Sequence, residues 1–352
     1  MSSLSMWFTS MEPCKPYLAM ILSQSIYAGL TLFSKVAIKG GMNPYVFVVY
    51  RQAIASAVLA PFAYFFERKK APAMSFTLFC KVFLLALIGI TVSMDLYYVA
   101  FKYTTATFAA ATSNAIPALT FLMAILLRME RLNMGYVHGQ VKVVGAVICI
   151  TGAFILSLYK GPPLKSLNLH HSSLHSITSS TASKDEWVKG AFLMLTCNAA
   201  WALWLVLQAP LMKAYPAKLT LTTLQCFLSA LQSAIVAFAI ERRPSSWKLN
   251  WDLNLLSVVY CGVAVTGLTY WLNLWCIEKK GPVFTAMFTP LVLLITAILS
   301  ALLWNEPLYW GSMIGGVLIV GGLYGVLWGK RKEEKVALEQ DLLPHIQSKG
   351  EP

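Results

Sequence analysis

Ten apolar stretches, each long enough to cross a lipid bilayer as a helix, constrain this chain more than any other feature of its sequence. Each has about 20 residues, and at 1.5 Å per residue a helix of that length spans the roughly 30 Å hydrocarbon core. The sequence therefore predicts an all-α membrane protein with ten transmembrane helices. The stretches are Tyr17–Ala37, Tyr45–Phe65, Leu78–Ala100, Thr105–Leu127, Tyr136–Leu158, Val188–Gln208, Leu219–Ile240, Leu255–Trp275, Val283–Leu303 and Tyr309–Trp328.

Composition and charge placement agree with a multi-pass membrane protein. Hydrophobic residues make up 57% of the 352 residues and charged residues 12%, against about 45–50% and 25% in soluble domains. The formal charge of +13 comes from Lys and Arg that lie almost entirely in connections, tails and last helical turns, where they meet lipid head groups. We therefore expect the lipid bilayer as a partner and no nucleic acid. With both termini in the cytosol, sixteen Lys and Arg face the cytosol and ten the other side, which favours this orientation.

The membrane region is duplicated at an offset of 174–176 residues. Glu67-Arg68 matches Glu241-Arg242, and Glu130 matches Glu306, with several glycines around it in register. Each copy holds five predicted helices, so the second copy must enter the membrane from the opposite side. Inverted repeats of this kind build the two alternating states of many secondary transporters. The expected divisions are a cytosolic N-terminal tail (1–16), a first repeat (17–158), a linker (159–187), a second repeat (188–328) and a disordered cytosolic tail (329–352).

The linker contains the only clustered candidates for metal binding, His170, His171 and His175. It is rich in Ser, Thr and Pro, so no rigid element would hold these imidazoles in the fixed geometry that a structural metal site needs. We expect a flexible linker, no metal and no cofactor. Motifs of membrane or soluble catalysis such as HExxH, GxSxG and Walker A are absent from the sequence, so we do not expect an enzyme.

Arg51 and Asp95 lie deep inside predicted spans, where ionisable groups are costly and mark either tight pairs or functional sites. Both are placed in the same half of the bilayer, Arg51 in the second helix and Asp95 near the end of the third. One reading is a buried ion pair that locks the two helices. The other is that Asp95 titrates or meets a substrate amino group while Arg51 attracts a carboxylate.

Two helical faces combine an amide with an aromatic ring at matching positions of the two repeats. Gln24 and Tyr27 share a face of the first helix, and Asn198 and Trp201 share the corresponding face of the sixth. These faces would line one central cavity and bind substrate. The alternative is hydrogen bonding between helices, which is common for buried amides in membranes.

Prolines interrupt the predicted fourth and ninth helices. Pro117 and Pro290 each remove one backbone hydrogen bond and are expected to kink the helix and to serve as hinges. Asn114 and Thr289 stand near them. Carbonyl groups freed at such a kink can bind ligands where they line a cavity, so Asn114 and Thr289 join the candidate substrate-binding residues.

Glycines are concentrated in the predicted fifth and tenth helices, at spacings that allow two helices to approach closely. This pattern favours packing within the chain, with a homodimer as the alternative. The glycines are Gly135, Gly139, Gly145, Gly152, Gly311, Gly315, Gly316, Gly321, Gly322, Gly325 and Gly329.

Several strings resemble the plant nodulin-like EamA transporters, also called the UMAMIT or WAT1-related family, of the drug/metabolite transporter superfamily. They are YRQAIASAVLAPFAYFFERK at Tyr50–Lys69, the stretch Lys102–Leu132, EKKGPVFTAMFTPL at Glu278–Leu291 and LWNEPLYWGSMIGG at Leu303–Gly316. The resemblance implies ten helices in two EamA repeats and transport of amino acids, often export, with an auxin carrier on the vacuole as a variation. Many members carry Asn where Asp95 stands here. The matching residues are Arg51, Gln52, Pro61, Glu67, Asn114, Pro117, Glu130 and Glu306.

Taken together, the sequence predicts a secondary carrier of amino acids that works by alternating access, in the plasma membrane rather than the vacuolar membrane. A zwitterionic substrate needs a cationic and an anionic partner, which Arg51 and Asp95 would supply. The nearest alternative is a carrier of auxin or another small organic anion. A channel or a scaffold without transport activity is the alternative of a different class.

Overall fold

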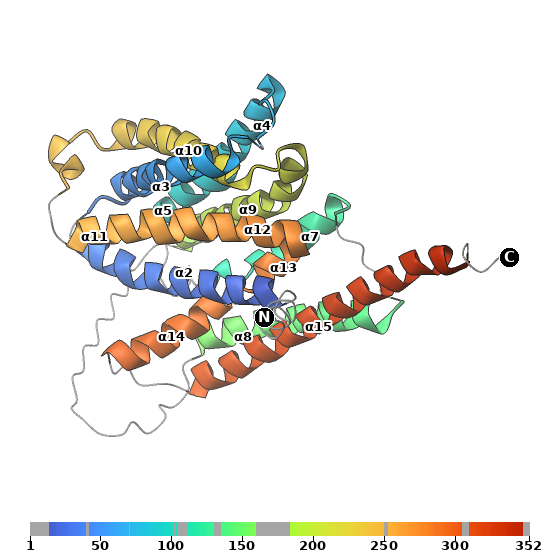
Figure 1. The fold of residues 1–352 in the computed structure, drawn as a ribbon. Coiled ribbons are helices and arrows are strands. Elements are labelled where there is room, and N and C mark those ends of the chain that lie inside the picture. The colour runs from blue at the N-terminus through green and yellow to red at the C-terminus, as the bar shows by residue number, and fades with distance from the viewer. Residues whose placement is uncertain are drawn as a thin grey trace, which may run out of the picture.

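The computed structural model describes residues 14–39, 42–69, 71–101, 103, 112–129, 135–159, 184–249, 253–304 and 310–347. All regular secondary structure in these ranges is helical (Figure 1). Outside these ranges lie residues 1–13, the predicted linker with His170, His171 and His175, and the matching repeat positions Glu130 and Glu306. The elements are α2 (Lys15–Lys39), α3 (Pro44–Glu67), α4 (Phe76–Ala86), η2 (Leu87–Val92), α5 (Ser93–Phe101), α7 (Ile116–Leu126), α8 (Val137–Leu158), α9 (Lys184–Ala214), α10 (Lys218–Ile240), η3 (Pro244–Trp247), α11 (Leu253–Tyr260), η4 (Cys261–Leu268), α12 (Thr269–Lys280), α13 (Pro282–Met287), α14 (Leu291–Trp304) and α15 (Trp310–Gln347).

Each of the ten apolar stretches contains a helix in its described part. Within these residues, seven helical segments are long and apolar enough to cross a membrane. Shorter apolar helices lie at Ile116–Leu126 and Pro282–Thr296. The prediction of an all-α, multi-pass membrane protein is confirmed, while the count of ten spans stays a prediction.

Helix contacts repeat when the two halves of the chain are exchanged. In the second half, α9 packs against η2, α5 and α7, and its first-half counterpart α2 packs against η4, α12 and α14. The remaining main contacts join a helix to its own counterpart, α3 to α10 and α8 to α15. These two pairs lie on opposite sides of the bundle, with α2 and α12 between them (Figure 1). The halves are therefore interlocked, and the centre of the molecule is built from both.

The third and eighth predicted helices each contain a π-helical segment at the same position of the repeat. These segments, η2 and η4, begin at Leu87 and Cys261, 174 residues apart. A π-turn inserts an extra residue into the helix and occurs frequently at functional sites. Everything after the insertion is rotated about the helix axis relative to an unbroken α-helix.

The predicted proline kinks are breaks between helices. In the first half a turn at Asn114 and Ala115 precedes α7, and Pro117 lies in the first turn of that helix. In the second half a turn from Phe288 to Pro290 separates α13 from α14. Pro at the start of a helix costs no internal hydrogen bond, because the first amides have no partner within the helix. The expectation of continuous kinked helices was wrong, and a hinge role for these prolines stays a prediction.

Glycines bring α8 and α15 into close contact. A Cβ atom added to Gly322 would lie 2.6 Å from the carbonyl oxygen of Gly145, and one added to Gly152 would lie 2.8 Å from the amide nitrogen of Ile319. These glycines therefore pack within the chain, as the first of the two readings had it. Gly321 differs, since a Cβ there would meet nothing within 4 Å.

The C-terminal region differs from the expected disordered tail. Helix α15 continues without a break through residue 329 to Gln347. Beyond the membrane-spanning part, Glu333 accepts a hydrogen bond from Lys142 of α8, with 3.0 Å between Nζ and Oε2. Lys142 is only 2% exposed, and a buried cation needs an anionic partner. This contact could not be predicted from the sequence, because a highly charged segment of low hydrophobicity is typical of disorder.

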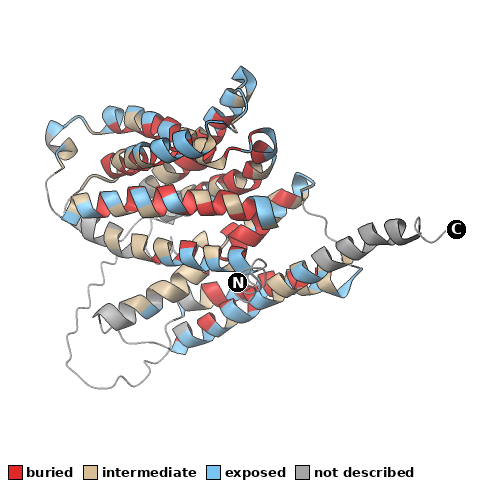
Figure 2. Cartoon of the chain, in the orientation of Figure 1, coloured by how far each residue is buried: buried red, intermediate tan, exposed pale blue. Residues whose placement is uncertain are grey.

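Buried residues gather on the inner faces of the helices and exposed residues on the outer faces (Figure 2). Many of the exposed side chains are large and apolar, such as Phe65, Phe76, Val317 and Tyr324. In water such a surface would drive aggregation, whereas in a bilayer it contacts lipid. The interior, by contrast, holds many polar side chains, and these form the candidate site.

Candidate functional site

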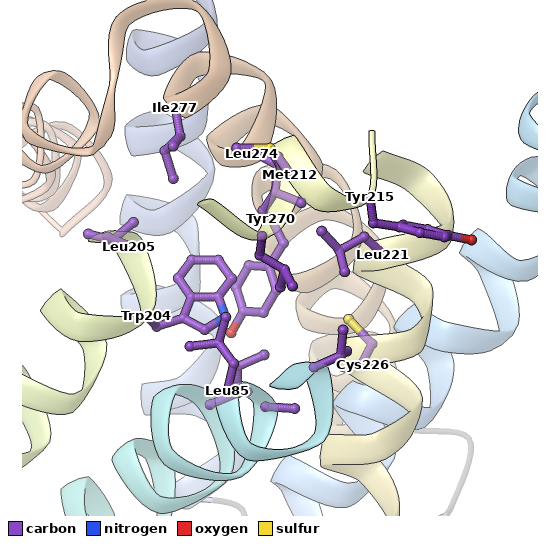
Figure 3. Packing of buried hydrophobic residues seen from close by; sticks show 14 of the residues in the cluster. Leu85, Trp204, Leu205, Met212, Tyr215, Leu221, Cys226, Tyr270, Leu274 and Ile277 are labelled. Carbon is purple, nitrogen blue, oxygen red and sulfur yellow. The ribbon is translucent and has the colours of Figure 1, made fainter. Parts of the chain in front are cut away.

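An aromatic group stands at the centre of the bundle. Trp201 and Trp204 of α9 stack with ring centroids 4.8 Å apart and planes 20° apart. Tyr270 of α12 meets Trp204 at 5.2 Å between centroids, and Figure 3 shows these two rings side by side in the core. Gly89 of η2 permits this arrangement, because a Cβ there would lie 2.6 Å from Trp204 Cδ1. Trp204 is fully buried, whereas Trp201 is partly exposed, so Trp201 offers the accessible ring.

A glutamine network fixes the position of the central indole. Trp204 Nε1 donates to Gln225 Oε1 of α10 at 3.1 Å. Gln208 of α9 donates to the same oxygen at 2.9 Å and accepts from Gln225 Nε2 at 3.2 Å. Because every partner is buried, these hydrogen bonds are shielded from water and hold α9 and α10 in register.

Arg51 lies beside the aromatic group, on α3. Its side chain is buried, and its Nε donates to Thr266 Oγ1 of η4 at 2.5 Å. Tyr27, Tyr270 and Cys226 lie within electrostatic range of the guanidinium. The charge therefore sits where helices of both halves meet, with one hydrogen bond to a π-helical segment.

Four buried polar atoms near this centre lack a hydrogen-bond partner in the described part of the chain. They are Tyr27 Oη, Gln52 Oε1, Asn198 Nδ2 and Tyr270 Oη. Gln52 and Tyr270 are 0% exposed and Asn198 is 3% exposed. Thr269 and Asn273 are neighbours of Tyr27, and Gln52 is a neighbour of Tyr270, but not in hydrogen-bonding geometry. An unsatisfied buried polar atom costs about 1–3 kcal/mol, and such atoms call for an explanation such as a ligand.

Of the predicted site residues, the structure brings Tyr27, Arg51 and Trp201 to this centre. Gln24 is buried on α2, one turn before Tyr27, and Asn198 is buried on α9, one turn before Trp201.

Asn114 and Thr289 lie at the breaks that precede α7 and α14. Asn114 is buried at the turn before α7, and Thr289 lies in the turn between α13 and α14. Their role as ligands stays a prediction.

The ion pair between Arg51 and Asp95 is not formed, although both residues are within the described ranges. Asp95 lies on α5 and interacts electrostatically with Tyr45 of α3 instead. It follows η2 by three residues, and the π-insertion rotates it away from the direction that an unbroken helix would give. Depth in the membrane was estimated from the sequence, but the rotation about the helix axis was not.

Sequence reasoning missed Gln52, Trp204, Gln225 and Tyr270 as central residues. A signal existed for two of them, because Gln52 follows Arg51 directly and Gln225 is the repeat counterpart of Arg51 at an offset of 174. Trp204 and Tyr270 had none, since an aromatic residue in an apolar stretch faces lipid as readily as it faces the interior.

These features define a multi-pass helical membrane protein with two interlocked halves and a buried polar centre, the plan of a transporter. The EamA-like transporter family matches residues 15–158 and 188–328, so the chain belongs to this family and holds two EamA repeats. It is 51% identical to WAT1-related protein At1g43650 of Arabidopsis thaliana over 92% of this chain and 93% of that protein. It is 50% identical to WAT1-related protein At5g64700 of Arabidopsis thaliana over 92% of each chain. The family resemblance seen in the sequence is confirmed.

A solved structure supports the fold independently. The crystal structure of another protein aligns with this chain with a TM-score of 0.69. The alignment covers 90% of this chain and 99% of the other at 17% identity. At this identity the likeness concerns the fold alone.

Proposed function

We propose that the protein is a secondary carrier of amino acids in the plasma membrane, working by alternating access of two inverted repeats around the central site. The observation that carries this proposal is the set of four buried polar atoms near the aromatic centre that lack a hydrogen-bond partner in the described part of the chain, two of them within electrostatic range of Arg51. Hydroxyl and amide donors fit a carboxylate, and the Gln52 oxygen fits an ammonium or amide N–H of the cargo. A bound amino acid would satisfy groups that the folded chain leaves unsatisfied.

The aromatic group favours a second candidate, auxin or another small organic anion, in the plasma or vacuolar membrane. Trp201 has a partly exposed ring, and stacking of a planar cargo on it would add about 0.5–1.5 kcal/mol beyond the buried area. Arg51 would attract the carboxylate in either case.

Exchange flux tests the carrier and separates the two cargoes. Oocytes expressing the protein are loaded with labelled glutamine, and efflux is followed with excess unlabelled amino acids or auxin outside. An amino-acid carrier shows glutamine efflux that is accelerated by external amino acids. An auxin carrier shows no such acceleration, but cells loaded with labelled auxin instead show auxin efflux that is accelerated by external auxin. A channel or scaffold shows no acceleration by cargo on the far side, and that result at confirmed surface expression contradicts the proposal.

Removing single hydroxyl groups tests the site. In Tyr27→Phe and Tyr270→Phe only an unpartnered oxygen is lost, so we expect unchanged or higher stability and a KM raised on the order of tenfold. The matched control is Tyr50→Phe, whose Oη donates to the Trp247 carbonyl oxygen at 2.6 Å. It should lose about 1 kcal/mol of stability and keep its KM. An unchanged KM in both central variants would place the cargo elsewhere.

A further inference from the structure

The antiparallel pair α3 and α10 is tied at both ends by glutamates that the repeat relates. Glu67 ends α3, and Glu241 follows α10, 174 residues later. Each carboxylate contacts the beginning of the other helix: Glu67 meets α10 at residues 219–220, and Glu241 meets Asn43, which caps α3. The two contacts therefore lie at opposite ends of one helix pair.

The Glu67 contact is made of three hydrogen bonds. Its Oε1 accepts from the Leu219 amide at 3.0 Å, and its Oε2 accepts from the Thr220 amide at 2.8 Å and the Thr220 hydroxyl at 3.0 Å. These amides open α10, where backbone N–H groups have no partner within the helix and where the helix dipole favours a negative charge. Tyr215 is packed beside it, and burial together with the Glu67 charge raises the pKa of that phenol.

A further ion pair adds a third helix to this end. Lys218 of α10 binds Glu278 of α12. Closure at this end thus joins α3, α10 and α12.

The Glu241 carboxylate makes fewer described hydrogen bonds to the other helix of the pair than Glu67 does. Its Oε2 accepts from Asn43 Nδ2 at 2.7 Å, while its Oε1 accepts from the nearby Arg243 amide, in its own loop, at 3.1 Å. Asn43 in turn accepts from the Tyr45 amide at 2.9 Å. The loop after Glu241 covers this end, because the Trp247 carbonyl accepts from Tyr50 and the Trp247 ring stacks on Phe238.

We propose that Glu67 and Glu241 are end-specific latches of the carrier, each closing one face of the membrane and each released when that face opens. The proposal rests on the proposed carrier function, because alternating access requires one face to open while the other stays closed. Both latches are made in this structure. Among the described residues, one hydrogen bond crosses between helices from the Glu241 carboxylate and three from the Glu67 carboxylate, so the resting protein opens more readily at the Glu241 end.

Accessibility of a central cysteine measures the latches. Cys226 is fully buried beside Arg51 and Tyr27, so it serves as the reporter once the other six cysteines are replaced by serine or alanine. A membrane-impermeant maleimide is applied to right-side-out and inside-out vesicles. The variants are Glu67→Ala and Thr220→Ala at one end and Glu241→Gln and Asn43→Ala at the other. The matched control is Thr223→Ala, whose hydroxyl bonds only its own helix at Leu219 O.

We expect Glu67→Ala to raise labelling of Cys226 from the Glu67 face on the order of tenfold and to lower it from the opposite face. Glu241→Gln and Asn43→Ala should raise labelling from the Glu241 face and lower it from the Glu67 face, by a smaller factor. Thr220→Ala should change labelling in the same direction as Glu67→Ala but less, and it leaves the Glu67 carboxylate in place. The unmutated background should label faster from the Glu241 face. If the Glu67 and Glu241 variants label like Thr223→Ala, or if their labelling rises equally from both faces, the latch proposal is wrong.

The same vesicles separate this inference from the carrier itself. If the background protein exchanges cargo but the variants leave the ratio of labelling from the two faces unchanged, the carrier function is supported and the latches are rejected. End-specific labelling without exchange of any tested cargo supports the latches as gates and rejects the proposed transport function.

Discussion

The helix pairs α8–α15 and α3–α10 occupy opposite sides of the bundle and are built on contrasting principles (Figure 1). Each joins a helix of one half to its counterpart in the other. The first is a glycine seam in which backbone meets backbone, as between Gly145 and Gly322. The second carries buried polar side chains on both helices, and these bond to neighbouring elements, as Arg51 does to Thr266 of η4 and Gln225 to Trp204 of α9. A glycine seam fits only one relative position of its helices, whereas buried polar side chains can exchange hydrogen-bond partners, so the first pair suits a fixed frame and the second a moving one.

Filling the glycine seam should have the largest effect. Gly322→Ala places a methyl group against the backbone of Gly145 and Cys149, and we expect a loss of about 3 kcal/mol, measured as a lower melting temperature in detergent. Gly321→Ala is the control one residue away, where a methyl group meets nothing within 4 Å. Equal losses in the two variants would mean that α8 and α15 are not held by close backbone contact.

Cutting the glutamine network that α10 makes with α9 should cost less. Gln225→Leu removes the acceptor of Trp204 Nε1 and of Gln208, and stranding these buried donors should cost about 1–3 kcal/mol. Thermal unfolding in detergent measures the loss. Ser233→Ala on the same helix is the control, because the Ser233 hydroxyl is buried without a partner in the described structure. It should be neutral or stabilising, and a loss equal to that of Gln225→Leu would argue against the network.

The extension of α15 after residue 329 can be released separately. Glu333→Ala removes a partner of buried Lys142, and the local helix after residue 329 should open more easily by about 1 kcal/mol. Hydrogen exchange of residues 330–347 measures this opening. Lys332→Ala, which removes only a contact with the Trp328 ring, should leave the exchange rates nearly unchanged. Unaltered rates in Glu333→Ala would show that the extension is held by other contacts.

The smallest effect is expected at Asp95. Because no ion pair links it to Arg51 in the structure, Asp95→Asn should change the KM for cargo less than about twofold. Exchange kinetics at several cargo concentrations measure this. A tenfold rise in KM would bring Asp95 back into the cargo site and would imply a conformation in which α5 turns toward α3.

The helical regions and the match between the two repeats could be predicted from the sequence, because length, apolar content and duplication are properties of the chain itself. It also placed Tyr27, Arg51 and Trp201 inside. It did not reveal the partners of these residues, because a polar residue in an apolar stretch must face inward but its neighbours depend on rotation about the helix axis. Asp95 shows this limit, since η2 precedes it and an undetected π-insertion redirects every later side chain.

The unbroken course of α15 has a practical consequence. From residue 330 to Gln347 the helix extends about 27 Å beyond the end of the predicted tenth span, at 1.5 Å per residue. A domain fused directly after Gln347 would therefore be carried on a helical spacer that continues the last predicted span. A fluorescent protein or a reporter enzyme fused there would be held clear of the lipid head groups, and an inserted glycine pair in the spacer would let it collapse toward them.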